Sequence, residues 1–146
     1  MRLWHQDMIE VLPRQQLLGQ HRECAALRGN GWAKSHETVN YIFDHNPVYL
    51  YYYHYLIIKE MVARGYTPDI KWLDPKYRGK NCNPHIHEIH PCVPDIIYKE
   101  HNDKYLLECL SNLHDKFTNA EEGKYDKQEL RKFYEFYHKK MTRLSL

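Results

Sequence analysis

The chain has 146 residues, a length that suits one domain, because two separate hydrophobic cores would each be small. Hydrophobic residues make up 42% of the chain and charged residues 27%, which favours a folded protein over a disordered one. Lys and Arg number 21 against 19 Asp and Glu, and the formal charge of +2 excludes a polycation that attracts nucleic acid through its overall charge. Any attraction to phosphate must therefore come from local clusters of basic residues.

The first residues and the apolar stretches of the sequence indicate the cellular location of the protein. The first residues, MRLWHQDMIE, carry charges and lack the apolar core of a signal peptide. The most apolar stretch, 50–62, is interrupted by His54, Lys59 and Glu60, so the sequence predicts no membrane span. The 4 cysteines are scattered without CxxC spacing, which is typical of reduced thiols in the cytoplasm. We therefore expect a cytoplasmic protein that does not associate with membranes.

Four segments with helical periodicity predict an all-α fold. They cover residues 13–28, 47–64, 103–117 and 127–141. Pro13 and Pro47 suit first helical turns, and Gly29 and Gly65 suit positions just past helix ends. Apolar residues three and four apart give these segments a stripe to bury. We expect a compact single domain over 1–146, built as a helical bundle of three to four helices.

A long segment, 66–101, separates the second and third predicted helices and shows neither helical nor strand periodicity. Loops of this length inside a compact domain are usually either functional or disordered. Large apolar side chains favour an ordered crossover loop that packs on the helices; they are Trp72, Tyr77, Ile86, Ile89 and Ile96.

The first predicted helix has two faces of different character. The face expected to be buried carries Leu17, Leu18, His21, Cys24 and Ala25. The opposite face carries Gln15, Gly19, Arg22 and Ala26, with Glu23 at its edge. A glycine inside a helix costs about 1 kcal/mol relative to alanine, so the small residues beside Arg22 indicate close approach by a partner.

The same residues, taken in order, carry a resemblance to a known family. Met1-Arg2, Gln15, Arg22-Glu23 and the helix-ending Gly29 resemble the pyrimidine-dimer DNA glycosylase/lyase family, typified by phage endonuclease V. Weaker similarity continues through Arg64-Gly65-Tyr66, Tyr77-Arg78-Gly79 and Pro84-His85. The close match covers residues 1–30, and the weaker one extends it to residue 85.

The resemblance implies a DNA repair enzyme that acts on damaged double-stranded DNA as a monomer and without a cofactor or metal. In the family, the N-terminal α-amine attacks C1′ of a deoxyribose, displaces the base and forms a Schiff base, and β-elimination then cleaves the strand. Carried over, this implies catalytic roles for Met1 and Glu23. It implies substrate binding by Arg2, Gln15 and Arg22.

Two positions depart from the family pattern. The family amine belongs to a threonine that is exposed by loss of the initiator methionine, whereas Arg2 is too large for that processing and leaves the amine on Met1. A histidine of the family site corresponds to Gln16 here.

These residue types suit the chemistry that the resemblance implies. An α-amine has a pKa near 8, about two units below that of lysine, and neighbouring Arg2 and Arg22 favour its neutral, nucleophilic form. The Glu23 carboxylate would stabilise the iminium cation and move protons. Phosphate contacts are expected from Arg28, Lys34, Arg78 and Lys80. The basic and aromatic segment 131–140 fits either a DNA-binding helix or a solvated basic face.

Two other functions remain compatible with the sequence. One is a non-enzymatic nucleic-acid binding module. The other is a zinc-binding protein that uses the loop 82–92, where Cys82, His85, His87, His90 and Cys92 could supply a tetrahedral site. The spacing of these residues matches no common zinc motif, so we expect no metal.

Overall fold

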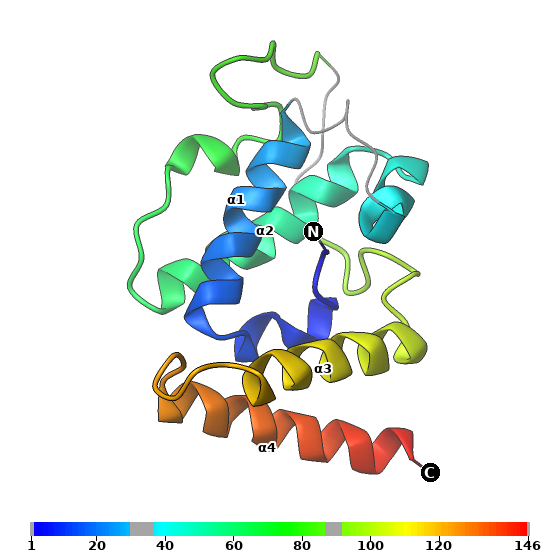
Figure 1. Cartoon of the computed structure of the whole chain (residues 1–146). Helices are drawn as coiled ribbons and strands as arrows, with labels where there is room; N and C mark the ends of the chain where they lie inside the picture. The colour runs from blue at the N-terminus through cyan, green and yellow to red at the C-terminus, as the bar shows by residue number, and fades with distance from the viewer. Residues whose placement is uncertain (1, 30–36, 87–91, 146) are drawn as a thin grey trace.

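The computed structural model describes residues 2–29, 37–86 and 92–145, which fold as helices and connecting loops without a strand (Figure 1). In chain order the elements are η1 (Gln6–Val11), α1 (Arg14–Arg28), η3 (Glu37–Asp44), α2 (Val48–Ala63), η4 (Ile70–Leu73), α3 (Asp103–Thr118) and α4 (Lys127–Leu144). The predicted all-α class is confirmed, and each of the four predicted helices is present. The last helix extends three residues beyond its predicted end at 141.

Local sequence signals explain where these helices begin and end. The Asn46 side chain accepts a hydrogen bond from Val48 N at 3.0 Å, and the Asp126 side chain accepts one from Gln128 N at 2.7 Å. After α2, Gly65 adopts a φ of 94°, a left-handed conformation that glycine reaches without steric strain.

The helices form two packed pairs, and the N-terminal segment of the chain connects one pair to the other. Helix α1 packs on α2, α3 packs on α4, and η1 contacts both α2 and α4. In Figure 1 the blue N-terminal segment runs between the α1/α2 pair above and the α3/α4 pair below. Five apolar residues of this segment are buried, together with His5: Leu3, Trp4, Met8, Ile9 and Leu12. The segment 2–12, for which the sequence predicts no element, therefore contributes several side chains to the core.

The crossover between α2 and α3 is only partly as predicted. The rings of Trp72 and Tyr77 pack edge to face, with centroids 4.7 Å apart. In contrast, Ile86 is 88% exposed and Ile96 is 72% exposed, so the prediction that they pack on the helices is wrong. Ile89 lies outside the described residues. The apolar contacts of the crossover thus come from Trp72 and Tyr77 and, at its other end, from Ile97 and Tyr98, which are buried in the core.

No helix in the described part of the chain has the length and apolar character needed to cross a membrane.

Candidate active site

The segment that follows the chain terminus is held by side chains from several helices. The carbonyl of Arg2 accepts a hydrogen bond from Gln20 Nε2 at 2.9 Å, and the carbonyl of Leu3 accepts one from the Tyr105 hydroxyl. The carbonyl of Trp4 accepts a hydrogen bond from the Tyr53 hydroxyl at 2.7 Å. Because α1, α2 and α3 each contribute a partner, the backbone after Met1 is fixed against the helical core. Met1 itself lies outside the described residues, and its peptide bond to Arg2 links its amine to this anchored segment.

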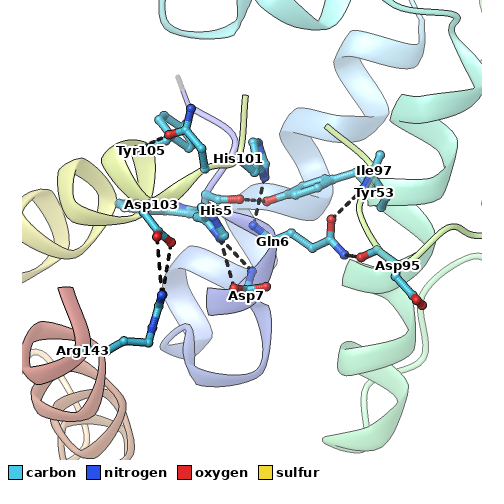
Figure 2. A network of polar contacts seen from close by, with 12 residues as sticks. His5, Gln6, Asp7, Tyr53, Asp95, Ile97, His101, Asp103, Tyr105 and Arg143 are labelled. Carbon is cyan, nitrogen blue, oxygen red and sulfur yellow. Dashed lines mark hydrogen bonds and ion pairs between the residues drawn. The ribbon is translucent and has the colours of Figure 1, made fainter. Parts of the chain in front are cut away.

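A second set of contacts fixes Gln6, two residues after Trp4, and involves residues distant in sequence (Figure 2). The Gln6 backbone N–H donates to His101 Nδ1 at 3.0 Å. The Gln6 side chain donates to the Asp95 carbonyl at 2.7 Å and accepts from Ile97 N at 3.1 Å. Burial lowers the pKa of His101 to about 3, so this ring is neutral and its Nε2–H donates to the Tyr41 hydroxyl at 2.6 Å.

Glu23 lies on α1 beside this anchored segment. Its Oε2 accepts a hydrogen bond from Gln20 Nε2 at 2.8 Å, and the same amide nitrogen donates to the Arg2 carbonyl. Burial raises the pKa of the Glu23 carboxyl above its ordinary value. The charge of Arg22 and the hydrogen bond from Gln20 oppose that rise, and so does the charge of Lys116 on α3. The amide group of Gln20 thus bridges the partly buried Glu23 carboxylate and the backbone carbonyl of Arg2.

The exposed face of α1 extends this site outward. Gln15, Arg22 and Ala26 are exposed, whereas Leu17 and Cys24 on the other side are buried, as the two-face pattern predicts. Gly19 adds no side chain to the exposed face, and the atom nearest to a Cβ placed there is Arg22 Nη2 at 3.8 Å. The face is therefore open beside the carboxylate.

Gln16, at the position of the family histidine, is half-buried between α1 and the α3–α4 connection. Its Nε2 donates to the Tyr125 hydroxyl at 3.0 Å, while its Oε1 is buried and has no hydrogen-bond partner.

Arg2 is half-buried and turned toward α3. Its Nη1 donates to Cys109 Sγ at 3.9 Å, and its guanidinium carbon lies 5.8 Å from the centroid of the Tyr105 ring. The Arg2 side chain therefore helps to hold the N-terminal segment on α3.

The residues expected to contact phosphate have different environments. Arg28 is 4% exposed and donates to the carbonyls of Trp72, Asp74 and Tyr77 at 2.8, 2.9 and 3.0 Å. This burial corrects the expectation that Arg28 faces DNA, because its guanidinium holds the crossover segment instead.

Arg78 also forms a hydrogen bond at the C-terminal end of α1. Its Nε donates to the Arg28 carbonyl at 3.0 Å, which caps the helix. Lys80 is exposed and remains available to solvent, and Lys34 lies outside the described residues.

Sequence reasoning missed Gln20, His101 and Tyr105. For Gln20 a signal existed, because it follows Leu17 by three positions and precedes Cys24 by four, which places a polar residue on the buried face. For His101 and Tyr105 no local signal existed, because their partners lie about a hundred residues away in the sequence.

The described residues contain no group of three or more His, Cys, Asp or Glu side chains that could hold a metal ion. His87 and His90, two of the candidate zinc ligands, lie outside those residues.

Comparison with known proteins gives one match. A model of the pyrimidine dimer DNA glycosylase family matches residues 1–74, a span that includes η1, α1, α2 and η4. No curated protein and no solved structure gives a significant match to the chain. The matched span contains Gln20, Glu23 and the exposed face of α1.

Proposed function

The chain belongs to the pyrimidine dimer DNA glycosylase family, and from this premise we propose that it releases the damaged base through its N-terminal α-amine and then cleaves the strand at the abasic site. The observation that carries the proposal is the Gln20 amide, which bonds both the Arg2 carbonyl and the Glu23 carboxylate. The amine of Met1 is one residue from that carbonyl. Nucleophile and carboxylate can therefore serve the same sugar.

The proposed reaction needs a neutral amine and a nearby carboxylate. The Met1 nitrogen bonds to C1′ of the deoxyribose while the base leaves with the electron pair of the glycosidic bond, and the nitrogen then loses one proton. The C1′–O4′ bond of the sugar ring opens next, with its electron pair and a proton going to O4′, which yields the iminium. The iminium acidifies the C2′ proton; removal of that proton expels the 3′ phosphate and breaks the strand. Water then releases the enzyme from the sugar. Glu23 stabilises the cation and carries protons, for which a pKa raised by burial is suited.

The open face of α1 supports a role in binding the substrate. Arg22 is exposed there and can donate two parallel hydrogen bonds to a phosphate beside the lesion. Gln15 is exposed on the same face and can bond a base or sugar edge. Gly19 lets a distorted DNA backbone come close to the helix.

Borohydride trapping tests the proposal directly. Wild-type protein is incubated with duplex DNA that carries either a pyrimidine dimer or an abasic site, and borohydride reduces any Schiff base to a stable adduct. We expect an adduct that maps to the Met1 peptide and that is lost after N-terminal acetylation. If the protein formed no adduct and bound damaged and undamaged duplex equally well, in a salt-sensitive manner, the result would indicate a non-enzymatic binding module instead.

Glu23→Gln tests the role of the carboxylate. We expect this variant to fold and to bind damaged duplex like the wild type, but to cleave it 100-fold or more slowly, on the order of the loss for one stabilising group in an active site. Unchanged cleavage would assign the catalytic carboxylate elsewhere.

A further inference from the structure

The side chain of Gln20 is a buried amide that has hydrogen-bond partners at both its oxygen and its nitrogen. Gln20 is 1% exposed, in the middle of α1. Its Oε1 accepts a hydrogen bond from Trp4 N at 2.7 Å and lies 2.8 Å from the Tyr53 hydroxyl, whose single hydrogen is shared between this oxygen and the Trp4 carbonyl. Its Nε2 donates to the Arg2 carbonyl and to Glu23 Oε2. An amide has two donor hydrogens and two acceptor lone pairs; both hydrogens are donated here, and Oε1 has two donor groups beside it.

The backbone partners determine which way this amide points. Trp4 N can only donate, so it must face Oε1, and the Arg2 carbonyl can only accept, so it must face Nε2. Rotating the amide by 180° would place like groups against each other at both positions. The second hydrogen of Nε2 is then directed at Glu23, which must accept it.

We propose that Gln20 is a positioning residue, which fixes the separation between the Glu23 carboxylate and the backbone of Arg2, the residue joined to the N-terminal amine, so that amine and carboxylate act on one sugar. The inference rests on the proposed function, because it assigns the nucleophile to the terminus. A glutamine is costly to bury unless it is fully hydrogen-bonded, and an apolar residue would fill the same place in the core. What the amide adds is a rigid link between two groups that must act together.

A glutamate cannot replace this glutamine in that role. Its carboxylate could still accept from Trp4 N and Tyr53, but its other oxygen would face the Arg2 carbonyl and the Glu23 carboxylate. A single bound proton would satisfy only one of those two acceptors. Gln20→Glu therefore preserves shape and two hydrogen bonds while it removes the link.

The first experiment compares Gln20→Glu with the wild type on duplex DNA that carries an abasic site. We expect kcat to fall on the order of 100-fold, as for misplacement of a reacting group by about 1 Å, with little change in KM. We also expect the acidic limb of the pH–rate profile to move upward by about one unit, because a carboxylate gains a like-charged neighbour. Gln128→Glu, the same change at an exposed position of α4, should alter neither quantity.

The second experiment does not depend on whether Gln20→Glu folds. In wild-type protein, the side-chain NH2 resonances of Gln20 are followed by NMR as pH is changed. We expect them to titrate with Glu23, and we expect Glu23→Gln to abolish that response. An amide that is not bonded to the Glu23 carboxylate in solution would show no such titration.

The outcomes separate this inference from the function on which it rests. A wild type that yields no trapped adduct overturns the proposed function and, with it, the role of Gln20. A wild type that yields the adduct, together with a Gln20→Glu variant of unchanged rate and pH profile, overturns the positioning role alone. Gln20 resonances that ignore the ionisation of Glu23 overturn it as well.

Discussion

The guanidinium of Arg28 and the ring of His54 share a hydrogen bond of 3.0 Å between Nη1 and Nδ1 in the interior of the protein. Arginine can only donate, so His54 Nδ1 accepts, and the neutral ring carries its proton on Nε2. That nitrogen lies 2.8 Å from His21 Nδ1, to which it donates. Burial holds the pKa of His54 well below its ordinary value, and the charge of Arg28 lowers it further.

Arg28→Lys should destabilise the protein without weakening its attraction to DNA. Lysine cannot reproduce the three hydrogen bonds to carbonyls of the crossover or the contact with the Trp72 ring, whose centroid lies 5.1 Å from the guanidinium carbon. We expect the free energy of unfolding in urea to fall on the order of 3 kcal/mol, because two or more part-buried carbonyls lose the buried guanidinium as their partner. Arg131→Lys, at an exposed position of α4, is the matched control.

Salt dependence decides whether Arg28 also meets phosphate. We expect Arg28→Lys to bind damaged duplex with the same slope of log affinity against log salt as the wild type. If Arg28→Lys kept the stability of the wild type but bound DNA more weakly, the result would show that Arg28 contacts phosphate.

The pH dependence of stability should report the buried histidines. The folded protein keeps His101 neutral down to a pKa of about 3, whereas the unfolded chain binds that proton near pH 6.5. Unfolding therefore takes up a proton below about pH 6.5, and stability falls as pH falls, by about 1 kcal/mol per pH unit for each such histidine. His54 adds to the loss with the same sign.

His101→Gln provides the measurement. The variant should be less stable at pH 7, since it loses the hydrogen bond to Tyr41, but its free energy of unfolding should fall less steeply between pH 6 and pH 4. His138→Gln, on the exposed side of α4, is the control. Equal slopes for His101→Gln and the wild type would exclude His101 as a source of acid sensitivity.

The sequence predicts the helices well because their signals are local. Caps such as Asn46 and Asp126, and apolar residues three and four apart, lie within the helix that they define. The exposed face of α1, including Arg22 and the gap at Gly19, follows from the same periodicity.

What the sequence does not predict depends on distant contacts. Arg28 has the position of a surface residue at a helix end, and its burial comes from carbonyls 44 to 49 residues later. The N-terminal segment has no periodicity of its own, and it becomes core because side chains such as Gln20 and Tyr105 bind its backbone. These are tertiary hydrogen bonds, which leave no pattern in neighbouring residues.

Glu23→Gln should make the protein more stable at neutral pH. Burial raises the pKa of this carboxyl in the folded state, so the folded protein loses stability as pH rises from the ordinary carboxyl pKa through the raised one. A neutral amide avoids that loss. We expect a higher Tm at pH 7, with about 2 to 4 °C for each kcal/mol gained, and no gain at pH 4. Glu135→Gln, at an exposed position of α4, should show no such pattern.

Two glycines, Gly19 within α1 and Gly29 directly after it, provide a final, paired prediction. A Cβ at Gly29 would lie 2.9 Å from the Arg78 carbonyl oxygen, so Gly29→Ala must displace the crossover backbone and should lower the Tm. A Cβ at Gly19 meets nothing closer than 3.8 Å, so Gly19→Ala should stabilise the helix by about 1 kcal/mol.

Activity then tests what the open space at Gly19 is for. If the DNA backbone approaches this face of α1, Gly19→Ala should process damaged duplex more slowly despite its higher Tm. Thermal melts and single-turnover cleavage of the same preparations measure both properties. Cleavage by Gly19→Ala at the wild-type rate would mean that the DNA does not come close to α1 at this position.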